Sequence, residues 1–338
     1  MRRRGITVLL GALVTALLSI GVLAAPIPYV VLGPGPTVDT LGTADGKQII
    51  QVSGRETSHS AGQLRLTTVG VQPNVKLLSA IAGWLSGDEA VVPRELIYPP
   101  GQTQQEVDER NAEDFAASQT SAETAALRKL GYPVQVVVGT VTADGPSAGQ
   151  LRPGDIITSV DGEAVTYGRM LTSLVQAKPA GSKLAIGYTR GGAPGTATVT
   201  SRADDGGKPR IGITIEQRQP HPFELKIDLG DIGGPSAGLM FALGIVDKLT
   251  PEDLTGGKII AGTGTINEEG KVGPIGGIPQ KLVGAKAAGA KVFLVPADNC
   301  AEALRNPQPG LPLLKVGSLD EALTALETLR AGGQPTRC

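Results

Sequence analysis

The stretch GGPSAGLMFALGIV at 233–246 places Ser236 directly before an apolar segment. Two glycines and Pro235 lead into the serine. The residues after it are apolar on nearly every side, which indicates a buried helix whose N-terminus faces Ser236. The free N–H groups and positive dipole end at such an N-terminus favour an anion, as an oxyanion hole requires. This local pattern fits a catalytic serine, and it equally fits an ordinary N-cap serine.

The same four residues, PSAG, occur earlier at 146–149 in a different context. Pro153 and Gly154 follow Ser147 within seven residues and prevent a longer helix. The neighbouring residues are polar. We therefore expect Ser147 to be a turn or cap serine at the surface that bonds a backbone N–H.

Length, charge and residue counts exclude several classes of protein. A length of 338 residues favours about two domains. The net charge of -1 offers no basic surplus for nucleic acid. There are two histidines, two cysteines and no Cys/His cluster, so we expect no zinc or other metal site. No phosphate-binding G-x-x-x-x-G-K-[ST] loop is present, and the sequence implies no cofactor.

The N-terminus carries a targeting signal. Arg2, Arg3 and Arg4 precede an uncharged run at 5–25, about the length that spans a bilayer. Arginines stay on the cytoplasmic side, so an anchor here places the remaining chain outside the cytoplasm. A cleaved signal peptide is the alternative, because VLAA resembles a small-residue cleavage site. Both alternatives allow a disulfide between the two cysteines, Cys300 and Cys338.

The region after this run is a mixture of strand and helix patterns. KQIIQVSG and GQLRLTTVGV indicate strands, and NVKLLSAIAGWLSGD indicates an apolar helix. The polar stretch from about 105 to 130 has helical spacing of its few apolar residues, so we expect a solvated helix resting on the body of the protein.

Residues 131–215 indicate a small β-barrel with one main helix. GPSAGQLRPGDIITSVDGEAV at 145–165, followed by an amphipathic helix at 166–177, resembles PDZ domains of bacterial proteases. The resemblance implies a groove between a strand and that helix, which takes an extended peptide, including its C-terminus, by β-addition. It places the carboxylate-binding loop at Leu130, Gly131 and Tyr132.

A catalytic serine needs a base. Both histidines, His59 and His221, stand in polar contexts. A lysine is the other candidate, because burial disfavours the ammonium and leaves an amine that accepts the serine proton. Lys281 and Lys286 both lie among apolar residues of a helix that begins near Pro279, and periodicity alone does not separate them.

Three motifs together resemble the proteolytic domain of the Lon family: the serine stretch above, AGTGTI at 261–266, and GKVGPIGGIPQKLVGAKAAGAKVFLVP at 270–296. The resemblance implies that Ser236 is the nucleophile and Lys281 the general base of a Ser-Lys dyad. It also implies that Thr263 supports the lysine. This chain departs from the family in two places. It reads TGT without the usual glutamate, and it has Gly233-Gly234 before Pro235 where many Lon proteins have Asp-Gly, with Asp231 two residues earlier.

We therefore expect a multidomain α+β and α/β protein: a transmembrane helix, a PDZ β-barrel-like domain and a Lon-type α/β proteolytic domain. The expected segments are a cytoplasmic N-terminus at 1–4, an anchor at 5–25, a segment completing the Lon-like domain at 26–130, the PDZ domain at 131–215, the proteolytic domain at 216–330 and a flexible tail at 331–338. The resemblance implies a single-pass protein of the bacterial cell membrane with an extracytoplasmic catalytic part and a ring-shaped homo-oligomer.

The expected activity is ATP-independent serine endopeptidase cleavage of unfolded or membrane-associated polypeptides. Backbone N–H groups around Gly233 to Ser236, Gly234 included, are expected to stabilise the oxyanion. Two alternatives stay open: a non-catalytic PDZ scaffold on a Lon-like fold, and a self-processing protein.

Overall fold

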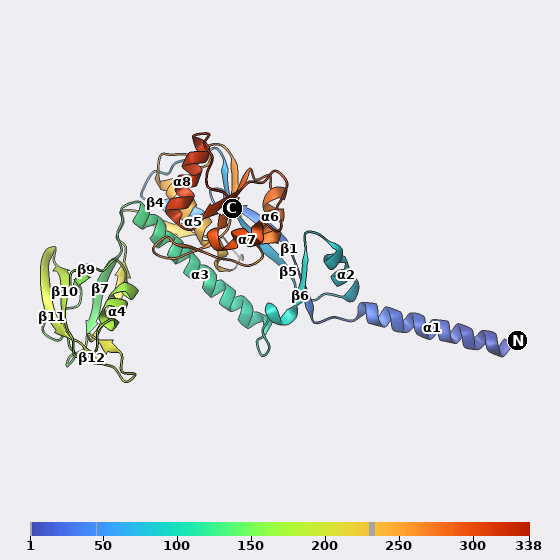
Figure 1. Cartoon of the computed structure of the whole chain (residues 1–338), viewed down its shortest axis with the longest axis horizontal. Helices are drawn as coiled ribbons and strands as arrows, with labels where there is room; N and C mark the ends of the chain where they lie inside the picture. Colours follow the sequence, from blue (N-terminus) through green and yellow to red (C-terminus); the bar gives the residue numbers. More distant parts are fainter. Residues whose placement is uncertain (1, 45, 230–233) are drawn as a thin grey trace. The chain divides into compact units, whose positions relative to one another are not determined.

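The computed structural model describes residues 2–44, 46–229 and 234–338, and the chain forms two compact units (Figure 1). Met1–Ala126 and Phe223–Cys338 form one unit, which we call the split unit. Leu127–Pro222 forms the other, which we call the inserted unit. The inserted unit therefore interrupts the split unit in sequence.

One six-stranded sheet organises the split unit, in the order β20-β19-β16-β5-β1-β6. Three strands precede the insertion: β1 (Tyr29–Asp39), β5 (Gln63–Gln72) and β6 (Ala90–Pro93). Three strands follow it: β16 (Ile259–Gly262), β19 (Val292–Pro296) and β20 (Leu313–Val316). β5 pairs in parallel with β16, so hydrogen bonds within a single sheet join the two halves of the chain.

Helices cover this sheet because their apolar faces need burial. α5 (Gly238–Leu249) is buried at all twelve positions, as its apolar sequence predicts. The other helices of the split unit are α2 (Leu77–Leu85), most of α3 (Gln104–Lys129), α6 (Ile278–Ala287), α7 (Cys300–Ala303) and α8 (Leu319–Arg330), with short 3-10 turns η1 (Arg94–Leu96), η2 (Pro235–Ala237) and η3 (Ala297–Asn299). Figure 1 shows α5, α6, α7 and α8 gathered around the sheet.

Smaller ladders complete the split unit. They are β2 (Thr43–Ala44) with β3 (Lys47–Gln48), β4 (Ile50–Ser53) with β15 (Glu224–Ile227), and β17 (Thr265–Ile266) with β18 (Val272–Gly273). The allowed disulfide is present between Cys300 and Cys338, and it ties the end of the chain to α7. The predicted flexible tail at 331–338 is thus attached at its last residue.

The first helix, α1, spans Arg2–Ala24, where the sequence predicts an anchor over 5–25. Across the described part of the chain, no helix is both long and apolar enough to cross a membrane. The anchor therefore stays a prediction from the sequence.

The inserted unit is a sheet with one main helix. The strand order is β11-β10-β8-β7-β14, with the short β9 paired to β8. The elements are β7 (Gln135–Val141), β8 (Ile156–Val160), β9 (Glu163–Ala164), α4 (Gly168–Gln176), β10 (Lys183–Arg190), β11 (Ala193–Thr200), β12 (Arg202–Ala203), β13 (Pro209–Arg210) and β14 (Ile213–Arg218). Leu171 and Val175 of α4 pack into the aliphatic core of this unit.

Candidate active site

The serine of the second PSAG stretch lies in η2, immediately before α5. Ser236 is half-buried, and its carbonyl oxygen accepts a hydrogen bond from the N–H of Gly264 at 2.9 Å. One turn later, the N–H of Leu239 donates to the Gly264 carbonyl oxygen at 3.1 Å. These reciprocal bonds attach the start of the buried helix to the chain that follows β16, which holds the serine in place.

Lys281 lies on α6 and is only 2% exposed. Its Nζ donates to Ser236 Oγ at 2.7 Å and to Thr263 Oγ1 at 2.8 Å. Burial lowers the pKa of Lys281 from 10.5 to about 7, because the ammonium loses its hydration. Near neutral pH a large fraction of this amine is therefore uncharged and within reach of the serine proton.

The break before α6 positions the lysine. Gly277 has a φ of 69°, and a Cβ there would lie 2.5 Å from Val69 Cγ2 on β5. A side chain at this position would be strained by the left-handed backbone and would also meet β5. The glycine therefore lets α6 begin directly against the sheet, one turn before Lys281.

Thr263 follows β16 and is fully buried. Its hydroxyl accepts from Lys281 Nζ and donates to the Ser236 carbonyl oxygen at 3.1 Å. One hydroxyl thus links the lysine to the backbone of the serine. Ser236, Lys281 and Thr263 come from three separate stretches of sequence, and the structure brings them into mutual contact.

A cleft of about 560 Å³ opens at Ser236 and Lys281. Ser236 and Lys281 lie in its lining, together with Thr68, Val69, Pro235, Thr265, Pro274, Ile275 and Gly276. The reactive hydroxyl and amine thus face a space that an extended chain segment can enter. Neither histidine is among the lining residues.

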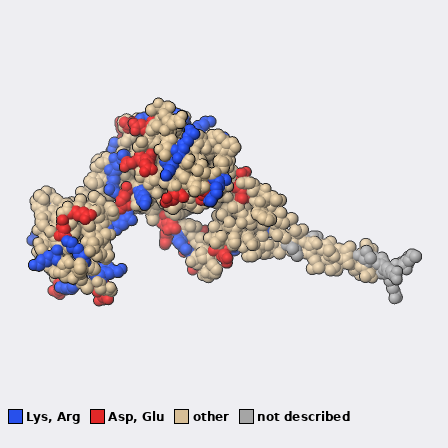
Figure 2. Space-filling model, viewed as in Figure 1, with Lys and Arg blue, Asp and Glu red and all other residues tan. Residues whose placement is uncertain are grey.

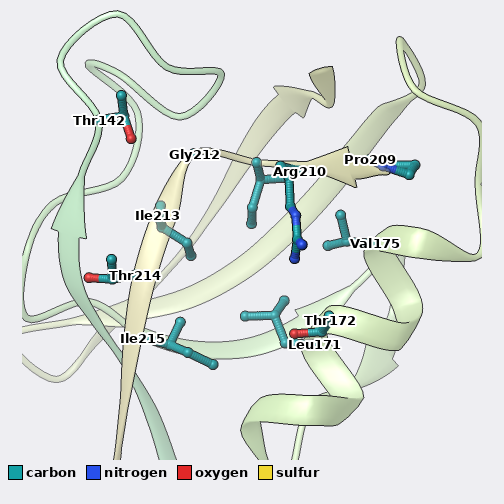
Figure 3. A pocket seen from close by; sticks show the side chains of 11 residues that line it. Thr142, Leu171, Thr172, Val175, Pro209, Arg210, Gly212, Ile213, Thr214 and Ile215 are labelled. Carbon is teal, nitrogen blue, oxygen red and sulfur yellow. The ribbon is translucent and has the colours of Figure 1, made fainter. Parts of the chain in front are cut away.

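A second, smaller cavity of about 320 Å³ lies in the inserted unit, between α4 and β14 (Figure 3). Figure 3 shows Leu171 and Val175 on the helix opposite Ile213 and Ile215 on the strand. β14 ends the strand order of its sheet and pairs only with β7 among the described residues. The groove therefore combines apolar side chains with a strand edge that is open to β-addition.

Two family matches fall largely on these two units. Residues 229–327 match the Lon protease (S16) C-terminal proteolytic domain, and residues 106–200 match the PDZ domain. The chain carries a Lon-type proteolytic domain and a PDZ domain. Among known proteins, Lon protease 1 of Sorangium cellulosum is 35% identical over 126 residues, which are 36% of this chain and 15% of that protein. Lon protease of Azospirillum brasilense is 40% identical over 93 residues, 27% of this chain and 11% of that protein.

A PDZ domain of an SdrC-like protein from Listeria monocytogenes is 33% identical, with a TM-score of 0.23. The match covers 24% of this chain and 85% of that structure. The chain spans about a seventh or less of the length of the Lon proteases that it matches. The similarity therefore concerns the proteolytic domain and not the rest of those proteins.

The predicted oxyanion residues of the Lon-type domain have different outcomes. Gly233 lies outside the described residues, as does Asp231. The N–H of Gly234 donates to the carbonyl oxygen of Asn111 on α3 at 3.1 Å. This amide is therefore engaged within the fold, and Pro235 has no N–H to offer.

The predicted carboxylate loop of the PDZ domain is misplaced. Leu130, Gly131 and Tyr132 do not line the groove beside α4. On the side opposite α4, that groove is lined instead by 209–215, where RIGITI supplies the first residues of β14 and the turn before it. The sequence does contain a glycine flanked by isoleucines in this stretch, Ile211-Gly212-Ile213. It follows the groove helix in the chain, whereas the loop was expected before the first strand of the domain.

The remaining candidates separate clearly by burial. Lys286, which periodicity could not distinguish from Lys281, is exposed. Ser147 is fully buried, contrary to the expected surface position, and its Oγ donates to the Ile211 carbonyl oxygen at 2.6 Å. Within the described residues, no group of three or more His, Cys, Asp or Glu side chains could hold a metal ion.

Proposed function

We propose that this protein is a serine endopeptidase in which Ser236 and Lys281 form the catalytic dyad and Thr263 positions the lysine. The observation that carries the proposal is the 2.7 Å contact between Lys281 Nζ and Ser236 Oγ. It joins a nucleophile to a buried amine whose pKa is lowered to about 7. The match of residues 229–327 to a proteolytic domain supports the same chemistry.

The reaction begins when the neutral amine of Lys281 takes the Ser236 proton as Oγ bonds to the substrate carbonyl carbon. The tetrahedral oxyanion collapses, Lys281 returns the proton to the leaving amine, and the peptide C–N bond breaks. Lys281 then takes a proton from water as the water oxygen attacks the acyl ester, and it returns this proton to Ser236 Oγ as the ester C–O bond breaks. No ATP is consumed in these steps.

We propose that the substrates are unfolded or membrane-associated polypeptides, taken as extended chains. The open cleft beside Ser236 accommodates such a chain, and the PDZ groove binds a second extended segment, including a C-terminus. The apolar residues Leu171, Ile213 and Ile215 favour apolar side chains in that segment.

The decisive test is cleavage of an unfolded, labelled polypeptide without ATP. We expect Ser236→Ala and Lys281→Ala to reduce kcat/KM by at least about 10³-fold, since each removes half of the dyad. Lys286→Ala is the matched control, because Lys286 is an exposed lysine on the same helix. Cleavage that survives in either dyad variant contradicts the proposal.

The alternatives predict different results in the same assay. A scaffold binds peptides at the PDZ groove, but the unmutated chain shows no turnover at any pH. A self-processing protein cleaves its own chain, and this cleavage is lost in Ser236→Ala while an added polypeptide stays intact.

We further propose an extracytoplasmic, membrane-associated location and a ring of identical subunits. The Cys300–Cys338 disulfide supports an oxidising compartment, where such bonds persist. Exposed Leu9, Leu13 and Leu17 on α1 support contact with an apolar phase.

The location is tested by membrane fractionation after carbonate extraction and by protease protection of protein tagged at Cys338. Mass measurement of the detergent-solubilised protein tests the ring, and a monomer contradicts it.

A further inference from the structure

Helix α3 contacts the loop that carries the nucleophile. Ser118 of α3 is 6% exposed, and its Oγ donates to the carbonyl oxygen of Pro235 at 2.9 Å. One residue earlier in the loop, the N–H of Gly234 donates to the Asn111 carbonyl oxygen at 3.1 Å. Phe115, between these two contacts on α3, packs edge-on against Phe241 of α5 with 5.7 Å between ring centroids. The helix thus holds the N–H of Gly234 and the carbonyl of Pro235, which belong to the peptide groups on either side of the Gly234–Pro235 peptide.

The close approach of α3 depends on Gly238, the glycine of the PSAG stretch. A Cβ at this position would lie 2.8 Å from Ser118 Oγ and 2.9 Å from Ile266 Cγ2. Any larger residue would force Ser118 Oγ and Ile266 to move and would disturb the Ser118 contact. Ser118 can reach the loop because residue 238 is a glycine and has no side chain.

The contact has a geometric consequence because a peptide group is planar. The Pro235 carbonyl and the Ser236 N–H belong to one trans peptide and point in opposite directions. A hydrogen bond that fixes the carbonyl therefore also fixes the direction of the N–H. The next peptide is held as well, since the Ser236 carbonyl oxygen accepts from Thr263 Oγ1 and from the Gly264 N–H.

Of the three described residues Gly234, Pro235 and Ser236, only Ser236 has an N–H suited to stabilise the oxyanion. The Gly234 N–H is engaged by Asn111, and Pro235 has no N–H. The Ser236 N–H belongs to the residue whose Oγ attacks, so it lies beside the carbonyl oxygen that becomes charged. We propose that Ser118 is a positioning residue that directs the Ser236 N–H toward the oxyanion of the tetrahedral intermediate. This inference rests on the proposed function of Ser236.

The experiment compares Ser118→Ala and Ser118→Cys in the full chain with Thr120→Ala. Cysteine nearly keeps the volume of serine but is a weak donor. Thr120 is the matched control, because its hydroxyl lies on α3, is exposed and bonds only to Ala116 within the helix. The readouts are kcat, KM, the pH midpoint of kcat/KM, the unfolding temperature, and the affinity of a peptide boronate that forms a tetrahedral adduct with Ser236.

We expect both Ser118 variants to lower kcat by about tenfold or more, less than the 10²–10³-fold loss of a deleted oxyanion donor. KM and the pH midpoint stay unchanged, because Lys281 keeps its contacts. Boronate affinity falls by the same factor as kcat/KM, while a non-cleavable product peptide binds as before. Thr120→Ala behaves as the unmutated protein.

Three results overturn the inference: full activity of Ser118→Cys, unchanged boronate affinity despite a lower kcat, or unfolding of both Ser118 variants at the assay temperature. The first and third mean that Ser118 serves only packing. Failure of the proposed function gives a different result: boronate binding and cleavage then persist in Ser236→Ala.

Discussion

At the residue scale, the environment of Lys281 decides what its amine can do. The side chain is almost completely buried, and its two polar partners are the hydroxyls of Ser236 and Thr263. Burial of the ammonium lowers the pKa of this side chain to about 7. An acidic partner would raise the pKa and keep the amine protonated. Among the residues that the structure describes, Nζ bonds to these two hydroxyls and to no carboxylate, which leaves the amine available as a base.

The lowered pKa of Lys281 gives a prediction for the pH dependence of activity. We expect kcat/KM to rise with pH and to reach half of its maximum near pH 7, because only the neutral amine accepts the serine proton. Rates measured between pH 5 and 9 in one mixed buffer test this. A profile that is flat across this range contradicts the role of Lys281 as base.

The same burial makes a prediction for stability. Between about pH 7 and 10.5 the unfolded chain binds more protons at Lys281 than the folded chain, so the free energy of unfolding rises with pH in that window. At pH 6, Lys281→Met removes a buried charge and is expected to keep or raise the free energy of unfolding while abolishing cleavage. Denaturant unfolding of both proteins at pH 6 and pH 9 tests this. A free energy of unfolding of Lys281→Met that is clearly below that of the unmutated protein at pH 6 contradicts the prediction.

Thr263 offers a test of how the lysine is held. Thr263→Val keeps the shape of the side chain but removes the hydroxyl that joins Lys281 Nζ to the Ser236 carbonyl. We expect kcat to fall by about ten- to a hundredfold, since a misplaced base loses reactivity steeply. Steady-state kinetics measure the effect, with Thr265→Val on the rim of the cleft as the control. Equal losses in both variants contradict a specific role for Thr263.

At the scale of elements, each PSAG serine holds a different loop. Ser147 Oγ donates to the carbonyl oxygen of Ile211, which precedes Gly212 and β14 at the PDZ groove. The serine has no place in the cleft of the Lon-type domain. Its role is therefore to hold one end of a peptide-binding groove, and a nucleophile is not needed to explain it.

Replacing Ser147 tests this assignment. Ser147→Ala leaves the Ile211 carbonyl without this partner and is expected to lower the free energy of unfolding of the inserted unit by about 1–3 kcal/mol. Binding of an extended peptide to the groove should weaken, while cleavage of a short unfolded substrate by the dyad stays intact. Calorimetry and peptide binding by fluorescence anisotropy measure the two effects. Loss of cleavage of short peptides in a folded Ser147→Ala protein contradicts this assignment.

At the scale of the whole molecule, charge is spread and mixed over the face shown in Figure 2. Both signs occur on it in small groups, in keeping with a net charge of -1. Stability at this scale depends instead on links between distant parts of the chain. β5 and β16 join the two halves of the split unit, and the Cys300–Cys338 disulfide closes its end.

The disulfide yields a prediction about the whole fold. The disulfide joins residues 38 positions apart and lowers the conformational entropy of the unfolded chain. Cys338→Ser is therefore expected to lower the free energy of unfolding by about 2–4 kcal/mol. Reduction with dithiothreitol should destabilise the unmutated protein by a similar amount and leave Cys338→Ser unchanged. Equal stability of the two proteins under oxidising conditions contradicts a structural role for the bond.

The sequence by itself determined the buried helix after Ser236 and the approximate units, and it predicted the dyad, because all three rest on local patterns. An apolar run after Pro235-Ser236 predicts a buried helix, and α5 is buried throughout. The motifs of the Lon family identified Ser236, Lys281 and Thr263, although helical periodicity did not separate Lys281 from Lys286. Alternating and aliphatic segments likewise indicated the strands of the inserted unit.

Only the tertiary structure decided which distant groups meet. It placed the groove at 209–215 instead of Leu130–Tyr132, it buried Ser147, and it brought Ser118 of a mostly polar helix against the nucleophile loop. These contacts join residues 64 and 117 positions apart in the chain. Their formation depends on how packed elements approach one another, at positions such as Gly238 where no side chain intervenes. Local sequence patterns do not specify how closely two distant elements pack, so only the tertiary structure determines these contacts.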